Sequence, residues 1–189
     1  GGVFYPDYFG KDFVLNDLTH DGGLTAIRIE GPTNSVDQRA NRLSKELGLL
    51  DQELSILDNE QSNIFWSRTK NLEVFKSLKS NLLRIVLPVS ETLQVIQKLK
   101  SYDIKYFVDW GGSLIWAVFE TLNAKILSDI KDIVKKHQGY ITLIKIEDDL
   151  KASADIFTID PIKYKISEKI KRSFDPKRIF NPGKMYTGI

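Results

Sequence analysis

The sequence has no cysteine and a single methionine among 189 residues. Without cysteine the chain has no disulfide, no thiolate nucleophile and no cysteine-bound zinc or iron–sulfur cluster. This absence fits a protein from a reducing compartment. The chain also begins with Gly1 and Gly2 instead of an initiator methionine, so we interpret its start as a processing boundary with sequence missing upstream.

A strong net charge and long apolar stretches are absent as well. Positive and negative residues are interspersed and the formal net charge is +2, too weak a bias to predict nucleic acid or an anionic membrane as a partner. No apolar run approaches the roughly 18–20 residues of a transmembrane helix, and the first residues lack the pattern of a signal peptide. These absences predict a cytoplasmic protein, and 42% hydrophobic residues suffice for a folded core.

The motifs of common self-contained enzymes are missing. There is no phosphate-binding Walker loop, no Gly-x-Ser-x-Gly nucleophile turn and no Gly-x-Gly-x-x-Gly fingerprint. The two histidines are His20 and His137, and no spacing of histidine and acidic residues predicts a metal site. His137 falls at the end of a predicted helix, where a cation is favourable, so a structural role is the simpler interpretation.

The first part of the chain predicts few regular elements. Residues 1–24 are interpreted as an irregular lead-in with one short strand at 12–15. A strand at 25–30 follows, and then a helix that stops at Gly48 and carries apolar residues at helical spacing, namely Val36, Ala40, Leu43 and Leu47. A second helix is predicted at 58–68.

The middle of the chain alternates strands and helices. A strand at 82–87 precedes a helix capped by Ser90, with Val89, Leu93, Ile96 and Leu99 on one face. Two strands around Gly111 and Gly112 then form a hairpin, with Ile104, Tyr106, Val108 and Trp110 in the first strand and residues 114–119 in the second. A helix capped by Asn123 and a strand at 140–146 complete the series. The order βαββαβ predicts an α+β, ferredoxin-like antiparallel sheet with both helices on one face.

The last part predicts a loop and a terminal helix. Residues 147–160 are interpreted as a loop with a charged start, and Pro161 begins a helix that ends before Asp175. Its apolar residues recur at helical spacing as Ile162, Ile166, Ile170 and Phe174. We therefore divide the chain into the lead-in, an α+β domain at 25–160 and a terminal helix with its tail at 161–189.

Three features could carry binding chemistry. Arg84 lies inside an apolar strand, where an unpaired charge is costly, so it needs an internal acidic partner or a cleft that takes a substrate carboxylate. Trp110 and Trp116 fall at alternate hairpin positions and could stack on a planar ligand, although core packing is the more ordinary interpretation. The tail residues Asn181, Pro182, Gly183 and Lys184 combine an amide, a rigid turn and a cation. They suit a clamp on a polar ligand and equally an ordinary terminal turn.

The tail from Phe174 to Tyr186 resembles the carboxy-terminal signature of FAD-linked oxidases of the vanillyl-alcohol-oxidase type. The resemblance extends upstream in order, through Ala26-Ile27-Arg28-Ile29-Glu30-Gly31, Arg84-Ile85-Val86-Leu87-Pro88 and Val108-Asp109-Trp110-Gly111-Gly112. These stretches are similar to the smaller, FAD-binding subunits of bacterial glycolate oxidases. The resemblance covers roughly residues 24–189.

The resemblance implies two domains with different functions. In that family an amino-terminal domain holds most of the FAD, and an α+β cap covers the reactive ring and contributes to the substrate pocket. It implies that Asn181, Pro182, Gly183 and Lys184 close the flavin site, and that Arg84 and Trp110 line the substrate side. The substrate would be a small 2-hydroxy acid such as glycolate, with the arginine neutralising its carboxylate.

This sequence lacks the Gly-rich flavin-binding loops of the family, so we expect the chain alone to bind no FAD and to be inactive. Its expected partners are the missing FAD-binding domain and other oxidase subunits, with peripheral attachment to the inner membrane through such a complex left open. An alternative function is a stand-alone ferredoxin-like module for a metabolite, nucleic acid or protein partner, although the strands lack an aromatic RNA-binding signature. A third hypothesis is that the gene is split or decayed and that its product folds but has lost activity.

Overall fold

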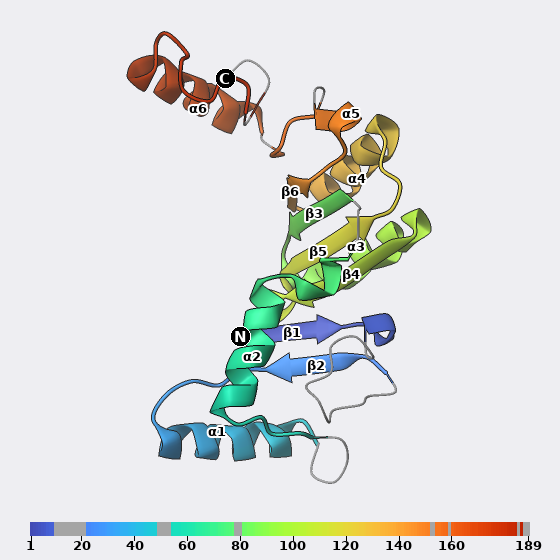
Figure 1. Ribbon diagram of the computed structural model, residues 1–189, viewed down its shortest axis with the longest axis vertical. Coiled ribbons are helices and arrows are strands. Elements are labelled where there is room, and N and C mark those ends of the chain that lie inside the picture. The colour runs from blue at the N-terminus through green and yellow to red at the C-terminus, as the bar shows by residue number, and fades with distance from the viewer. Residues whose placement is uncertain are drawn as a thin grey trace. The chain divides into compact units, whose positions relative to one another are not determined.

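The computed structural model describes residues 1–9, 22–48, 54–77, 81–151, 154–158, 160–184 and 186. The chain divides into two compact units, Gly1–Ser77 and Leu78–Ile189, and Figure 1 labels their helices and strands. Both units combine helices with antiparallel strands, which confirms the predicted α+β class. The strand expected at 12–15 and His20 lie outside the described residues.

The first unit contains a strand pair that the sequence did not predict in full. Strand β1 (Gly2–Tyr5) pairs antiparallel with β2 (Leu24–Ile27), whereas the beginning of the chain was expected to be irregular. Val3 and Tyr5 of β1 are buried and Phe4 between them is exposed. Four residues are too short a stretch for this period of two to stand out in the sequence.

The rest of the first unit is helical, with an aromatic core. Its helices are α1 (Thr33–Glu46) and α2 (Asn59–Lys70), accompanied by the short 3₁₀ turns η1 (Asp7–Phe9) and η2 (Glu73–Phe75). The rings of Tyr5, Phe9, Phe65 and Phe75 are buried and meet edge to face. The Tyr5 hydroxyl donates to Thr69 Oγ1 at 3.0 Å, so β1 is fixed to α2 by both packing and a buried hydrogen bond.

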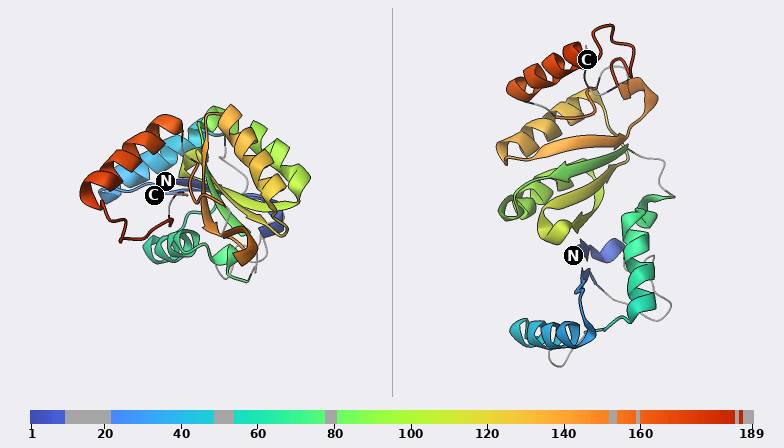
Figure 2. Two further views of the ribbon diagram at one scale, coloured as in Figure 1. Left: turned by 90° about the horizontal axis from the view of Figure 1, so that it is seen from above. Right: turned by 90° about the vertical axis from the view of Figure 1, so that its left-hand side faces the viewer.

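The second unit contains the predicted βαββαβ series. It runs β3 (Asn81–Val86), α3 (Val89–Leu99), β4 (Ile104–Asp109), β5 (Leu114–Phe119), α4 (Ala124–Lys136) and β6 (Tyr140–Lys145). The strands lie in the order β4-β5-β3-β6, and every neighbouring pair is antiparallel. Figure 2 shows α3 and α4 side by side against these strands. The predicted order of elements is thus present in the structure.

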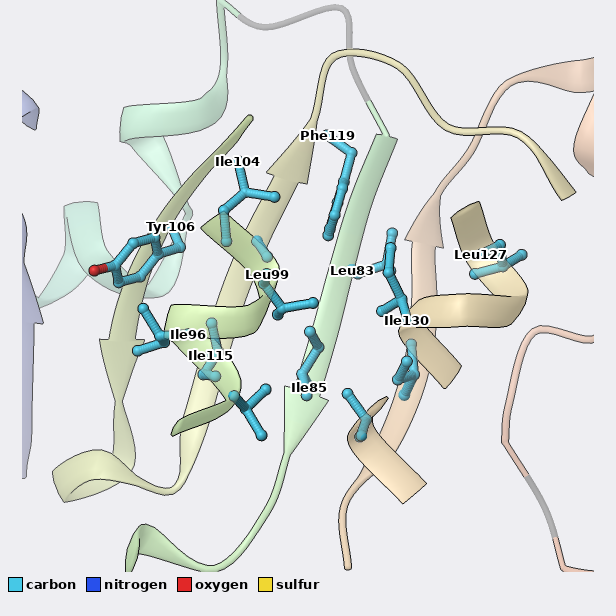
Figure 3. Packing of buried hydrophobic residues seen from close by; sticks show 14 of the residues in the cluster. Leu83, Ile85, Ile96, Leu99, Ile104, Tyr106, Ile115, Phe119, Leu127 and Ile130 are labelled. Atoms are coloured by element: carbon cyan, nitrogen blue, oxygen red, sulfur yellow. The ribbon is translucent and has the colours of Figure 1, made fainter. Parts of the chain in front are cut away.

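The core of the second unit fills the space between the sheet and these two helices. Strand residues such as Leu83, Ile85 and Ile115 meet Leu99 of α3 and Ile130 of α4 in one cluster (Figure 3). Because successive strand residues point to opposite faces, the residues between these apolar positions lie on the other face of the sheet. Arg84 is one of them.

Several local predictions at the start of α3 were wrong. The residue before the helix is Pro88 with no side-chain cap, so Ser90 lies inside α3 and does not cap it. Val89 and Leu93 are 61% and 65% exposed, although Ile96 and Leu99 of the predicted face are buried. The buried face also includes Thr92 and Val95, because the helix is rotated relative to the face that the sequence suggested.

The carboxy-terminal helix follows its prediction closely. Helix α6 (Pro161–Phe174) is preceded by Asp160, whose carboxylate accepts the backbone N–H groups of Ile162 and Lys163. Asn123 likewise caps α4 by accepting from the N–H of Ile126. The expected loop at 147–160 differs in one respect, since Asp148–Lys151 forms the short helix α5. No helix in the described part of the chain is long and apolar enough to cross a membrane.

Candidate functional site

The register of the second unit sets the position of Arg84 near the middle of the sheet. Arg84 on β3 lies opposite Trp116 on β5 and opposite Thr142 on β6, and Trp116 lies opposite Phe107 on β4. Cross-strand partners share a face, so these four residues line the face turned away from α3 and α4, which we call the Arg84 face. Arg84, Trp116 and Thr142 are partly buried there.

Trp110 does not belong to the strand in which the sequence placed it. Strand β4 ends at Asp109, and Trp110 begins the 3₁₀ turn η4 (Trp110–Gly112) with a φ of 53°. Gly111 and Gly112 follow at φ 63° and 108°. A Cβ atom at Gly112 would lie 2.5 Å from Cγ2 of Val89, so this glycine is required both by its backbone conformation and by the close approach of α3.

The turn brings Trp110 and Arg84 together. The Arg84 Cζ atom lies 4.7 Å from the centroid of the Trp110 ring, within the range of a cation–π interaction. Arg84 forms no ion pair with an acidic residue in the described part of the chain. The sequence left two possible partners for Arg84, an internal acidic residue or a substrate carboxylate. Among the described residues, the internal salt bridge does not form.

The carboxyl group of Asp109 lies next to this pair. Asp109 is opposite Leu114, which places its side chain on the Arg84 face, and its Oδ1 accepts the backbone N–H of Trp110 at 2.6 Å. Burial raises the pKa of Asp109, and the Trp110 hydrogen bond opposes that rise. Asp109 was not among the residues predicted to be functional. Its position directly before a Trp-Gly-Gly turn was the available signal.

Trp116 takes a different environment from Trp110. Its ring lies beside that of Phe107, with centroids 6.5 Å apart and planes inclined at 31°. Phe107 is fully buried and Trp116 is partly buried, whereas Trp110 is 56% exposed. Trp116 is thus a packed residue of the Arg84 face, and Trp110 is the tryptophan with a ring surface available to a ligand.

The tail after α6 is held by one buried carboxylate. Asp175 accepts the backbone N–H groups of Ile179 and Phe180 at 3.0 Å each. Lys171 Nζ lies 2.7 Å from Asp175 Oδ2 and also donates to the Phe180 carbonyl. The Lys171 hydrogen bond lowers the pKa of Asp175 to about 2, assisted by the two backbone N–H groups and opposed by burial. The segment from Asp175 to Phe180 is therefore a defined turn.

The predicted flavin-proximal residues follow this turn. Asn181, Pro182, Gly183 and Lys184 are all exposed, and the space around a Cβ atom at Gly183 is empty within 4 Å. No hydrogen bond, ion pair or ring contact between described residues joins these four to Arg84 or Trp110. A chain of contacts still leads from the tail to the Arg84 face. The ring of Tyr186 meets that of Phe157, and Phe157 forms a β-bridge with Thr142.

His137 lies away from the Arg84 face and joins α3 to the end of α4. Its Nδ1 lies 2.6 Å from Glu91 Oε2 and its Nε2 lies 2.7 Å from Lys98 Nζ. Both ring nitrogens of His137 are thus within hydrogen-bond distance of a charged side chain on α3. The arrangement ties two helices together, in keeping with a structural role. Among the described residues, no three acidic or histidine side chains gather as metal ligands would.

Comparison with known proteins finds a distant relative but shows no family. No family model matches the chain. A curated protein named Glycolate oxidase subunit GlcE, from Escherichia coli strain K12, is 26% identical over 176 residues. The chain is similar to an oxidase subunit. The match covers 93% of this chain and 42% of the relative, so the chain spans less than half the length of that protein. The similarity supports a distant relationship and agrees with the resemblance read from the motifs.

Proposed function

We propose that this chain is the substrate-side, carboxy-terminal part of an FAD-dependent 2-hydroxy-acid oxidoreductase related to glycolate oxidase subunits. The observation that carries the proposal is the environment of Arg84. A partly buried guanidinium stacks on Trp110 and has no acidic partner among the described residues. Such a cation favours an anionic ligand, and a planar carboxylate matches the fork of N–H groups at the guanidinium edge.

The chemistry of this chain is recognition of the substrate. Arg84 binds the carboxylate of a 2-hydroxy acid and neutralises its charge, and Trp110 shields one face of the guanidinium from water. The apolar neighbours of Arg84 lower the local dielectric and strengthen the ion pair that the substrate forms. FAD, when bound by the complete protein, supplies the acceptor for the hydride. The described residues provide no candidate for a self-contained redox centre, so the chain alone is expected to be inactive.

The tail suits one wall of a flavin site. Asn181 offers an amide and Lys184 a cation, both exposed, and Gly183 permits a close backbone approach because nothing lies near its Cα on the side-chain side. These groups fit the polar edge of a flavin as donors. The phosphate-binding loops must come from another domain, since this sequence contains no Gly-rich loop for them.

The exposed face of α6 supports the presence of a further domain. Ile162, Ile166, Ile170 and Phe174 recur every four residues and are between 53% and 84% exposed. Ile179 and Phe180 in the following turn are 66% and 69% exposed. A soluble helix normally turns such a stripe inward. We therefore propose that this stripe contacts the FAD-binding domain or another oxidase subunit, through which the assembly could also attach to a membrane surface.

A titration of the isotope-labelled chain with glycolate tests the proposed role of Arg84. We expect saturable NMR shifts of the Arg84 Nε–H and Trp110 indole N–H signals, with a dissociation constant in the millimolar range. The neutral analogue glycolamide has the same shape without the carboxylate charge and should cause no such shifts. Arg84→Gln should abolish the response of Trp110, and Arg42→Gln on exposed α1 should preserve it.

Two results would count against this role. Equal shifts with glycolamide would show that charge is not recognised, and an unchanged response of Trp110 in Arg84→Gln would show that Arg84 is not the recognition group. Binding of glycolate by the chain, together with a native assembly that contains no flavin, would instead favour the alternative of a stand-alone module for small carboxylates.

A further inference from the structure

The Trp110 turn is held in a conformation that its residue types alone would not choose. Trp110, Gly111 and Gly112 are three consecutive residues at positive φ. Glycine adopts this region readily, but a tryptophan in it is uncommon and persists only where the surroundings hold it. The groups that hold Trp110 therefore determine where its ring lies.

Three side chains fix the turn. Asp109 Oδ1 accepts the Trp110 N–H at 2.6 Å, the Thr92 hydroxyl donates to the Gly112 carbonyl at 2.5 Å, and the Ser113 hydroxyl donates to the Trp110 carbonyl at 3.2 Å. Asp109 is the one that bonds the strained residue at its amide, just before the Cα that carries the indole. It is thus the side chain best placed to set the direction of the ring.

The orientation of Trp110 has a direct consequence for Arg84. The indole is more than half exposed, so packing alone does not immobilise it, and yet it lies over the guanidinium at 4.7 Å. With one guanidinium face covered, the N–H edge remains for a ligand. An ion pair between Asp109 and Arg84 would block that edge, but Asp109 makes none and uses its oxygen on Trp110 instead.

We propose that Asp109 is a positioning residue for carboxylate recognition: its carboxylate holds the Trp110 turn, and the Trp110 ring in turn holds the Arg84 guanidinium with its N–H edge presented to the substrate. The proposal rests on the proposed function for the identity of the ligand. In this arrangement Asp109 accepts a hydrogen bond that supports the Arg84–Trp110 pair, and it does not itself contact the substrate.

The first readout needs no ligand. A proton above an aromatic ring is shifted to lower frequency, so the Arg84 Nε–H signal of the full chain reports the stacking directly. Asp109→Ala removes the acceptor and should move this signal toward the position of an unstacked arginine. Asp109→Asn keeps an acceptor oxygen of similar geometry and should preserve the shift. Asp109→Glu keeps the charge but displaces the oxygen, and should lose the shift as Asp109→Ala does.

Together the three variants distinguish the effect of the Asp109 hydrogen bond from the effect of its charge and from a general loss of stability. A shift that persists in both Asp109→Ala and Asp109→Glu overturns the proposal. Loss of the shift in Asp109→Asn also overturns it, because an acceptor oxygen in the same place would then not suffice to hold the turn. If Asp109→Ala does not fold, Asp109→Glu still decides the question, and backbone amide signals of α4 and β6 serve as the check on folding.

The second readout is the glycolate concentration that half-saturates the Trp110 indole signal. We expect it to rise several-fold in Asp109→Glu and to stay near the wild-type value in Asp109→Asn. An unchanged concentration in Asp109→Glu, together with a lost ring shift, overturns the link to recognition. If the wild-type chain shows no response to glycolate while the ring shift depends on Asp109 as expected, the proposed function fails and the positioning of Trp110 by Asp109 stands.

Discussion

Arg84 and Asp175 are charged residues that differ in whether the chain itself provides a partner of opposite charge. Asp175 is satisfied by Lys171 and by two backbone N–H groups, so it is a structural carboxylate. Arg84 stacks on Trp110 and has no acidic partner among the described residues, although its two neighbours along the strand are apolar. A charge that folding leaves without a counterion is better explained by a ligand than by stability.

The pH dependence of stability tests the role of Asp175. Its pKa in the folded chain is about 2, below the roughly 3.9 of an unfolded aspartate. The ionised carboxylate therefore stabilises the fold above that unfolded pKa, and the contribution is lost as the pH falls toward the folded pKa. Asp175→Asn should lower the free energy of unfolding near neutral pH, and the difference from wild type should shrink as the pH is lowered from about 4 to about 2.

Urea unfolding at a series of pH values measures this difference. Asp37→Asn, at an exposed position of α1, is the matched control and should leave the free energy of unfolding nearly unchanged. A difference between wild type and Asp175→Asn that stays constant across the acidic range would contradict the assignment.

Among the elements, α4 and α6 have similar sequence patterns and opposite surroundings. Ile130 of α4 is fully buried in the sheet–helix core, whereas Ile166 of α6 is 53% exposed. Periodicity predicts the helices correctly in both cases, but it cannot say whether the partner of an apolar stripe lies in the same chain. The exposed stripe of α6 is the surface that we propose to contact the FAD-binding domain or another oxidase subunit.

A matched pair of substitutions measures this contrast. Ile130→Ala should lower the free energy of unfolding by about 2–5 kcal/mol, because it removes buried methyl groups and leaves a cavity. Ile166→Ala is the same change on the surface and should stay within about 0.5 kcal/mol of wild type. A large loss of stability from Ile166→Ala, measured by chemical denaturation of the purified chain, would mean that the stripe is already covered.

Several features that depend on residues close together in the sequence were predicted correctly, whereas features that depend on distant contacts were not. The cap at Asn123, the helix start at Pro161 and the βαββαβ order depend on neighbouring residues and on periodicity, and the structure confirms them. Strand β1 was missed because four residues carry too little pattern. The stacking of Trp110 on Arg84 could not be foreseen, since it depends on a left-handed turn that places a hairpin residue over a strand two positions away in the sheet.

For the whole molecule, we propose that cofactor binding and substrate recognition lie on different domains. We propose that the chain carries a carboxylate site and one wall of a flavin site, and its sequence holds no Gly-rich loop for the cofactor's phosphates. Purified by itself, the chain should therefore be colourless, and it should remain so after incubation with FAD and removal of the excess. A stoichiometric yellow complex in the visible spectrum would show that the chain forms a complete flavin site.

Reduction of bound flavin by glycolate in the native assembly tests whether this chain forms the substrate side of a flavin-dependent oxidase. The chain would be tagged, purified from the cells that encode it together with its partners, and followed by visible absorbance without oxygen. We predict that flavin accompanies the wild-type chain and is bleached by glycolate. Arg84→Gln should retain the flavin and require about 10- to 150-fold more glycolate, since a charged hydrogen-bonded pair contributes roughly 1.5–3 kcal/mol. An assembly without flavin, or one in which Arg84→Gln responds to glycolate as wild type does, would contradict the account.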